Sequence, residues 1–230
     1  MFSRYSLVAS ADELAKRFAV DVPEAYRVQY NAAPSHLLPV ITQDSQKGLS
    51  FFYWGAPPLW ANKKPLGEKI INTRLELLSE KPVLQKKMRE NRCLIPADGF
   101  YEWKRAGKKT SIPYRFTLED KTVFSIAGLW EEYDDEQGNV FHTFTVITRE
   151  AHTSVLPVSE RMPVILNIGF EAGWLSSKSD SELLSMLKSS ACSLEYYSVS
   201  HRVNSPDRND KFVIMPAPPA DQYGNLTLFD

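Results

Sequence analysis

Short apolar stretches separated by turn residues dominate the chain, and several of them alternate between hydrophobic and polar positions. Such stretches are typical of β-strands, because successive residues of a strand face opposite sides of a sheet. They predict strands at Leu37–Thr42, Leu49–Trp54, Cys93–Pro96, Gly99–Lys104, Tyr114–Glu119, Val123–Trp130, Val140–Thr148, Pro163–Leu166 and Glu195–Ser200. We expect Gln46-Lys47-Gly48 to form the turn between the first two strands, and the acidic segment 134–138 to form the turn of a later hairpin.

Helical patterns are fewer and shorter. They predict helices at Ala11–Phe18, Pro82–Arg89, Glu171–Leu175 and Ser181–Lys188. The tail from about Pro216 is rich in proline and glycine and is expected to run over the surface. Many short strands with few helices predict an α+β fold, a single β-rich domain over residues 1–230. Its sheet is expected to be mostly antiparallel and either folded over on itself or closed into an open barrel.

The charge of the chain restricts where nucleic acid could bind. The 230 residues are 43% hydrophobic and 24% charged, as in an ordinary globular protein, and the formal net charge is −1. Any affinity for DNA must therefore come from a local basic surface. Basic residues gather at Lys63, Lys64, Lys69 and Arg74, at Lys81, Lys86, Lys87, Arg89 and Arg92, and at Lys104, Arg105, Lys108 and Lys109. This pattern suits a phosphate-binding surface, with a solvated helix face as the alternative for Lys86, Lys87 and Arg89.

Cysteine and histidine residues are too few and too scattered for a metal site. Cys93 and Cys192 have neither the spacing of a disulfide framework nor that of metal ligands, and the histidines include no HxH or HxxxH pair. We therefore expect no metal and no other cofactor. The amino-terminal residues lack the apolar core of a signal peptide, and no run approaches the roughly 20 apolar residues of a membrane span. A cytoplasmic protein that makes no contact with a membrane is expected.

Glu102 is the first candidate for a chemical role. In Gly99-Phe100-Tyr101-Glu102-Trp103-Lys104, strand alternation places Tyr101 and Trp103 on one face and Phe100, Glu102 and Lys104 on the other. Aromatic neighbours would partly remove water from the carboxylate and raise its pKa toward the range of a general acid. A surface glutamate paired with Lys104 is the alternative.

Asn72 and two tryptophans are further candidates. Asn72 can donate and accept hydrogen bonds, and Arg74, two residues on, can bind a phosphate with two nitrogens. The alternative for Asn72 is a cap of the next segment. Of the two tryptophans around the proline turn, Trp54 is expected in the core, as is Cys93. Trp60 is the better candidate for stacking on an unpaired base.

Seven short motifs, taken in order, resemble the SRAP family, the SOS response-associated peptidase or abasic-site processing proteins. They are Arg4-Tyr5-Ser6, Tyr30-Asn31-Ala32-Ala33-Pro34, Trp54-Gly55 with Trp60, Asn72-Thr73-Arg74, Gly99-Phe100-Tyr101-Glu102-Trp103, Arg161-Met162-Pro163 and Val199-Ser200-His201-Arg202-Val203-Asn204. One such motif would be weak, but the ordered set spans almost the whole chain. The resemblance implies one mixed α/β domain, monomeric, that binds single-stranded DNA at abasic sites and associates with the nucleoid when it is bound.

The family resemblance also implies a chemistry. Family members carry a cysteine directly after the initiator methionine. Removal of that methionine by autoproteolysis accounts for the peptidase name. The exposed α-amine then condenses with the aldehyde of the abasic sugar, and the thiol closes a thiazolidine ring that links the protein to DNA. Asn72 and Glu102 match the family's active-site asparagine and glutamate, with Glu102 as the proton-transfer group. The implied DNA-binding residues are Arg4, Asn31, Pro34, Trp60, Arg74, Thr148, Arg161, His201 and Arg202.

Two positions depart from the family pattern. Phe2 stands where the family has its cysteine, and Ser159 stands where it usually has an active-site histidine. Without the thiol no thiazolidine can form, so one hypothesis is abasic-site processing that survives as Schiff-base lyase chemistry through an α-amine. A second is a module that binds single-stranded DNA without covalent chemistry. A third and weaker one is a thiol peptidase or hydrolase that uses Cys93 or Cys192.

Overall fold

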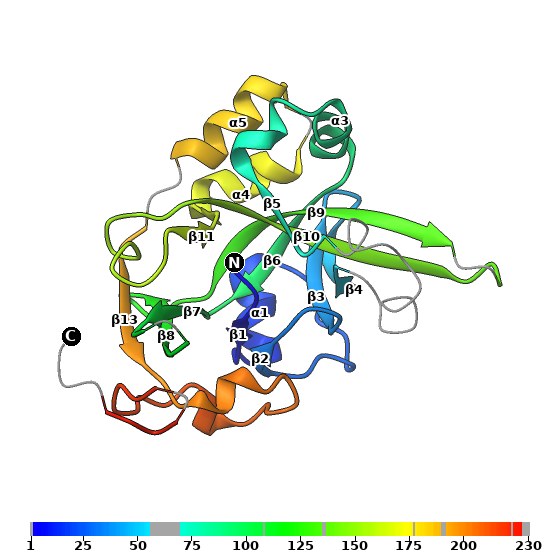
Figure 1. The fold of residues 1–230 in the computed structure, drawn as a ribbon. Helices are drawn as coiled ribbons and strands as arrows, with labels where there is room; N and C mark the ends of the chain where they lie inside the picture. Colours follow the sequence, from blue (N-terminus) through cyan, green and yellow to red (C-terminus); the bar gives the residue numbers. More distant parts are fainter. Residues whose placement is uncertain are drawn as a thin grey trace.

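Two β-sheets form most of the molecule in this computed structural model, which describes residues 2–55, 70–107, 109–134, 137–176, 178–189, 192–221 and 223–226 (Figure 1). The strands of the first sheet are β1 (Tyr5–Leu7), β2 (Gln29–Ala32), β7 (Gly99–Arg105), β8 (Ser111–Leu118) and β13 (Leu194–Ser198). They pair antiparallel in the order β13-β8-β7-β1-β2. This order places the short first strand between β7 and β2.

The second sheet closes on itself. Its ring consists of β3 (Leu37–Thr42), β4 (Ser45–Trp54), β6 (Arg92–Ala97), β9 (Phe124–Asp134) and β10 (Val140–Glu150). The ring is closed because β10 pairs both with β4 and with β9. Three short strands are added to it, namely β5 (Asn72–Arg74), β11 (Arg161–Pro163) and β12 (Ile165–Leu166).

Helices are few and short, as expected. They are α1 (Ala11–Phe18), α3 (Pro82–Glu90), α4 (Ile168–Leu175) and α5 (Asp180–Ser189), with 3-10 turns η2 (Leu75–Leu78), η3 (His201–Asn204) and η4 (Lys211–Val213). Helix α1 begins with a capping box, in which the Ser10 side chain accepts from the Glu13 N–H and the Glu13 carboxylate accepts from the Ser10 N–H. Helices α3, α4 and α5 gather on one side of the closed sheet (Figure 1).

The predicted β-rich α+β class and its mostly antiparallel pairing are confirmed, with two corrections of detail. The barrel is closed rather than open, and the turn between β3 and β4 lies at Gln43 and Asp44 rather than at 46–48. Residues 47–49 are extended because they bind the segment before β2: the Asp21 N–H donates to the Lys47 carbonyl, and the Leu49 N–H donates to the Asp21 carbonyl.

The core lies between the two sheets and within the closed one. Phe2, Trp54 and Phe100 belong to the main cluster, and Cys93 is fully buried there, so the core positions predicted for Trp54 and Cys93 are confirmed. Tyr101 packs in a second cluster on the other side of β7, as strand alternation predicts.

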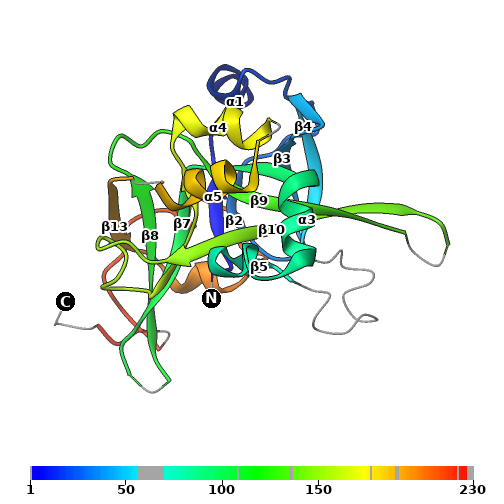
Figure 2. The same ribbon diagram turned by 90° about the horizontal axis from the view of Figure 1, so that it is seen from above.

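The hairpin of β9 and β10 extends beyond the rest of the described fold, and both views show it reaching outward past β4 (Figures 1 and 2). Near its base, the ring of Phe52 stacks on His142 at 4.8 Å. Within the described ranges, every helix is too short or too polar to cross a bilayer.

Candidate functional site

The amino-terminal end of the chain meets both sheets at one place. In the first sheet, β1 lies beside β7 with Tyr5 opposite Phe100, and the Tyr101 N–H donates to the Arg4 carbonyl at 3.1 Å. Continued by two residues, this antiparallel register brings Ser3 beside Glu102. From the second sheet, the Asn72 side chain donates its Nδ2 hydrogen to the Phe2 carbonyl at 2.5 Å. Glu102 and Asn72 thus flank the same stretch of backbone.

Asn72 is positioned by the pairing of β5 with β10. Residues Asn72–Arg74 run parallel to Val146–Thr148, and the Thr148 hydroxyl donates to the Thr73 carbonyl at 3.2 Å. Asn72 is therefore the first residue of a strand, and its side chain holds the Phe2 backbone, so the capping alternative is wrong. Its Oδ1 atom is buried and has no hydrogen-bond partner in the described part of the chain.

Glu102 is buried, with 3% of its surface exposed, so the alternative of a surface glutamate is wrong. Burial raises the pKa of its carboxyl to about 7, although the charge of the amino terminus and hydrogen bonds with Ser159 and the Trp103 backbone act in the opposite direction. Near neutral pH the group can therefore either give or take a proton. Its Oε1 atom, like Oδ1 of Asn72, is buried without a partner among the residues that the structure describes.

Phe2 and Ser159 are the two positions that depart from the family pattern. Ser159 lies beside Glu102, and Phe2 packs against Phe100 on the same strand as Glu102. The Phe2 ring is fully buried, 5.4 Å from the Trp54 ring and 6.1 Å from that of Phe100. Phe100 and Glu102 lie on the same face of β7. The Ser159 hydroxyl donates to the Arg161 carbonyl at 2.9 Å and accepts from the Arg161 N–H at 3.3 Å. An apolar ring and a small hydroxyl therefore occupy these two positions.

Arg161 is fixed at the edge of the site. Its two terminal nitrogens donate to the Glu76 carboxylate at 2.9 and 3.1 Å, and Nη2 also donates to the Thr148 carbonyl at 2.8 Å. This leaves Thr148 buried behind the guanidinium. Arg74, in contrast, is exposed and has no hydrogen-bond or ion-pair partner in the described ranges. Arg74 is therefore free to bind a phosphate, whereas Arg161 is already bound to a carboxylate.

Three other predicted DNA-binding residues lie around the carboxyl-terminal segment. Asn31 is fully buried, and its Nδ2 donates to the carbonyls of Val203 and Ser205 at 3.2 and 2.9 Å. His201 uses both ring nitrogens, one on the Ala220 carbonyl at 2.7 Å and one on the Asn204 side chain at 3.0 Å.

Arg202 is more exposed than its neighbour His201. It lies 5.6 Å from the Phe212 ring centre and 3.9 Å from an Asp210 oxygen. Asn31 and His201 are therefore placed to hold this segment, whereas Arg202 faces solvent.

Arg4 and Pro34 lie on the amino-terminal side of the site, where β1 and β2 pair. Arg4 is half-buried and Pro34 belongs to the turn that follows β2. Trp60 and the predicted basic residues Lys63, Lys64, Lys69 and Lys108 lie outside the described residues.

The predicted basic surface around α3 is largely neutralised. Arg92 is buried and donates to backbone carbonyls, among them that of Trp174 at 2.6 Å, so its assignment to a phosphate-binding surface is wrong. It caps the ends of α3 and α4 instead. Lys87 forms an ion pair with Glu131, and Arg89 forms one with Asp180 at 2.5 Å.

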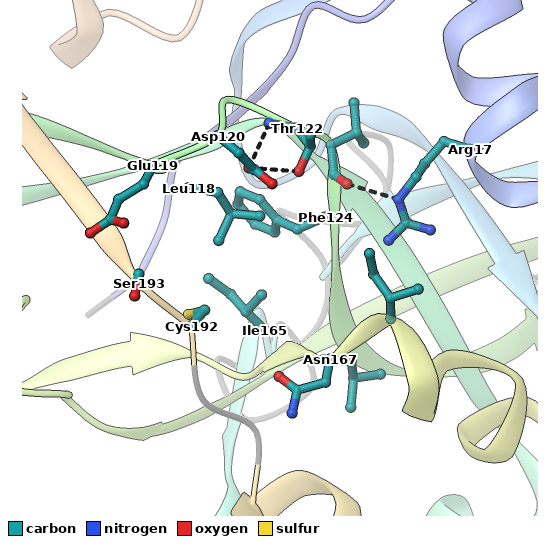
Figure 3. A pocket seen from close by; sticks show the side chains of 13 residues that line it. Arg17, Leu118, Glu119, Asp120, Thr122, Phe124, Ile165, Asn167, Cys192 and Ser193 are labelled. Carbon is teal, nitrogen blue, oxygen red and sulfur yellow. Dashed lines mark hydrogen bonds between the residues drawn. The ribbon is translucent and has the colours of Figure 1, made fainter.

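A cavity of about 560 Å³ adjoins the site. Asn72, Thr73 and Arg74 line one side of it, and Lys81, Val83 and Leu84 of the α3 region line the other. A separate cavity of about 380 Å³ is built from the ends of β8, β9 and β12 (Figure 3). Its lining includes Cys192, the candidate nucleophile of the thiol-hydrolase hypothesis, but none of the predicted DNA-binding residues. There Arg17 donates from Nε to the Val123 carbonyl and pairs with Glu171 at 2.7 Å, so its charge is already compensated.

Two residues at this site carry no signal in the sequence. Glu76 holds Arg161 across 85 positions of the chain, and His36 lies near Arg4 without belonging to any motif. No group of three His, Cys, Asp or Glu residues that could hold a metal ion occurs in the ranges that the structure describes.

Comparison with known proteins gives a consistent picture. The profile of the family described as "SOS response associated peptidase (SRAP)" matches residues 1–206. The abasic site processing protein YoqW of Bacillus subtilis is 40% identical over 93% of this chain and 99% of its own. YoaM of the same organism, with the same description, is 39% identical over 91% of this chain and 95% of its own. A crystal structure of a Bacteroides thetaiotaomicron protein superposes with a TM-score of 0.78 at 26% identity, over 93% of this chain and 99% of that one.

Proposed function

The chain belongs to the SOS response-associated peptidase (SRAP) family, and from that premise we propose that it recognises abasic sites in single-stranded DNA. One observation carries the proposal. Asn72 and Glu102 approach the amino-terminal backbone from different sheets, and each presents a buried oxygen that has no partner within the described ranges. Unsatisfied buried acceptors are costly, so they indicate a ligand that brings hydrogen-bond donors.

A ring-opened abasic sugar has the donors that such a site requires. Its hydroxyl groups can donate to Oδ1 of Asn72 and Oε1 of Glu102, and the flanking phosphates can bind Arg74 and Arg4. An intact nucleotide would carry a base at the same position. Recognition of the missing base then follows from the enclosed site around Glu102, which is 3% exposed.

The raised pKa of Glu102 favours a second, chemical step. An α-amine ahead of Phe2 would add to the aldehyde carbon, and loss of water from that adduct would leave an imine. Removal of a C2′ proton would then break the C3′–O bond and expel the 3′ phosphate. Glu102, with a pKa of about 7, is suited to move these protons at neutral pH. Because position 2 carries no thiol, the imine stays open to hydrolysis.

Binding without covalent chemistry is the competing candidate, and a different observation favours it. The Phe2 ring packs into the core instead of offering a nucleophile. Ser159, which hydrogen-bonds to Glu102 and to the Arg161 backbone, offers a hydroxyl where the family has an imidazole. A site altered at both positions could keep its affinity for the lesion and lose the reaction.

A denaturing gel separates these possibilities. The protein is incubated with single-stranded DNA that contains one abasic site, with and without cyanoborohydride, beside an undamaged strand of the same sequence. We expect no heat-stable adduct without reductant and an adduct with it. Phe2→Cys should give a heat-stable adduct without reductant, and Glu102→Gln should slow strand cleavage.

Other results would change the assignment in defined ways. Preferential binding of the abasic strand in a native gel, with no trapped adduct, would make the protein a non-covalent binder. Abasic-site recognition would be contradicted if the protein bound the abasic and the undamaged strand equally well and neither the unaltered protein nor Phe2→Cys formed an adduct.

A further inference from the structure

The turn at residues 33–36 presents a histidine beside Arg4. It follows directly on β2, whose Ala32 lies opposite Tyr5 of β1. Two hydrogen bonds attach the turn to the end of β4: the Ser35 N–H donates to the Trp54 carbonyl at 2.8 Å, and the Trp54 N–H donates to the His36 carbonyl at 3.0 Å. The Trp54 ring in turn packs against Phe2 and Tyr5, at 5.4 and 5.5 Å. The backbone of the turn is therefore held in place relative to Arg4.

Arg4 and His36 both have hydrogen-bonding capacity to spare. Arg4 uses Nη1 on the carbonyl of Ser3 at 2.8 Å, but its Nε is buried and has no partner in the described part of the chain. The His36 ring, which is half-buried, makes no hydrogen bond or ion pair with any residue that the structure describes. No carboxylate of the described residues holds either side chain, unlike Arg161, which is bound to Glu76.

The charged groups that face His36 come from two other segments. Burial lowers the pKa of His36, the Arg4 guanidinium lowers it further, and Asp207, which follows η3, raises it. The net shift is downward, so the imidazole is neutral at and above pH 7 in the free protein. A negative charge placed between Arg4 and His36 would reverse this balance and favour the imidazolium.

We propose that Arg4 and His36 together bind one phosphate of the DNA strand, with His36 taking up a proton from solvent as the phosphate arrives. This inference rests on the proposed function and deepens it. Arg4 lies two positions from Phe2, whose carbonyl is held by Asn72. An abasic sugar at Asn72 and Glu102 carries a phosphate on either side, and a phosphodiester supplies both the acceptor that Arg4 lacks and the charge that His36 needs.

The test measures binding of an undamaged single strand at pH 6 and pH 8 by fluorescence anisotropy. All variants are made in a Glu102→Gln background, because Glu102 titrates in the same range and would add its own pH dependence. We expect this parent to bind about three- to ten-fold more tightly at pH 6, as for one group whose pKa rises by up to one unit on binding. Adding His36→Gln should remove most of this difference between the affinities at pH 6 and pH 8. Adding His36→Arg should make binding at pH 8 as tight as that of the parent at pH 6.

His142→Gln is the matched control, because this histidine lies on the β9–β10 hairpin and pairs with Glu132. This variant should keep the full ratio of the affinity at pH 6 to the affinity at pH 8. An unchanged ratio in His36→Gln would overturn the inference while leaving DNA binding intact. Absence of binding of an abasic single strand by the unaltered protein at either pH would instead contradict the proposed function, so the two failures are distinguishable.

A second measurement does not depend on any variant of the binding residue. The imidazole Hε1 signal of His36 is followed by NMR as a function of pH, with and without the undamaged strand, and His36→Gln serves only to assign it. We expect the His36 pKa to rise on binding. A His36 pKa that is the same with and without DNA would overturn the inference.

Discussion

At the scale of single residues, Glu102 shows how a site for chemistry reduces stability. Its carboxyl is buried and has one oxygen without a partner among the residues that the structure describes. The folded protein therefore favours the protonated form, and the group binds its proton more tightly folded than unfolded. Ionisation of Glu102 therefore lowers the free energy of unfolding. The same burial that raises the pKa of this group toward neutrality causes the loss of stability.

Glu102→Gln is therefore expected to stabilise the fold at high pH. The folded-state pKa of about 7 lies above the ordinary 4.5, so the wild type loses stability as the pH rises from 4.5 to 7. A neutral glutamine escapes that loss, which amounts to about 3 kcal/mol at most above pH 7. Urea unfolding should show this gain in the free energy of unfolding at pH 8 and little of it at pH 4.5.

Glu76→Gln is the control with the opposite sign. Some burial raises the pKa of Glu76, but the hydrogen bond and charge of Arg161 outweigh it and lower the pKa overall. The ionised form therefore contributes stability above the ordinary pKa, and the substitution should reduce stability at pH 8. A gain at pH 8 for Glu76→Gln, or no gain for Glu102→Gln, would contradict these assignments.

At the scale of elements, the first strand depends on a buried ion pair for its place. Nη2 of Arg115 on β8 lies 2.7 Å from an Asp98 oxygen just before β7, and Arg115 and Asp98 both bind the Ser6 hydroxyl of β1. The Asp98 carboxylate also accepts from the Val8 N–H. This network joins β1, β7 and β8, and so it sets how the amino-terminal end approaches Glu102.

Asp98→Ala is expected to be strongly destabilising, because it leaves the Arg115 charge buried and unpaired. Removing one partner of such a pair costs about 3–5 kcal/mol. Asp180→Ala is the matched control, since it breaks the exposed ion pair with Arg89 on α3 and should cost about 1 kcal/mol or less. Thermal or urea unfolding of the two variants provides the comparison. Equal losses would mean that the buried network does not hold β1.

At the scale of the whole molecule, the charge distribution limits how DNA can be held. The net charge of −1 provides no general attraction, and several cations of the α3 region are paired or buried. Affinity for a strand must come from a small set of side chains around the site. Arg4, Arg74, Arg161 and Arg202 are the candidates, and they belong to segments far apart in the sequence.

Binding of single-stranded DNA should therefore depend only moderately on salt. Because Arg161 is bound to Glu76, three arginines remain for phosphate contacts, and they predict a slope of about −2 in a plot of log affinity against log salt concentration. Arg74→Ala should make the slope shallower by about 0.7. Lys16→Ala, an exposed cation on α1, should leave it unchanged. A slope near zero for the unaltered protein would rule out phosphate contacts as the source of affinity.

Much of the fold could be predicted from the sequence because its longer elements follow local rules. The alternation in Gly99–Lys104 placed Glu102 and Phe100 on one face of a strand, and β7 confirms it. The capping residues Ser10 and Glu13 mark the start of a helix that the structure places at the predicted bounds. The order of the short motifs was sufficient to indicate the family that the comparisons show.

Only the tertiary structure decided how those elements meet. Strands β1 and β5 have three residues each, too few for a periodic pattern, and they are strands because long-range partners pair with them. The contacts of Asn72 with Phe2, of Glu76 with Arg161 and of the residue 33–36 turn with Trp54 likewise join distant segments. Local propensity carries no information about such pairings, since each depends on which surfaces the closed sheet brings together. The sequence by itself therefore determined the residues available for chemistry, and the packing of two sheets decided which of them face one another.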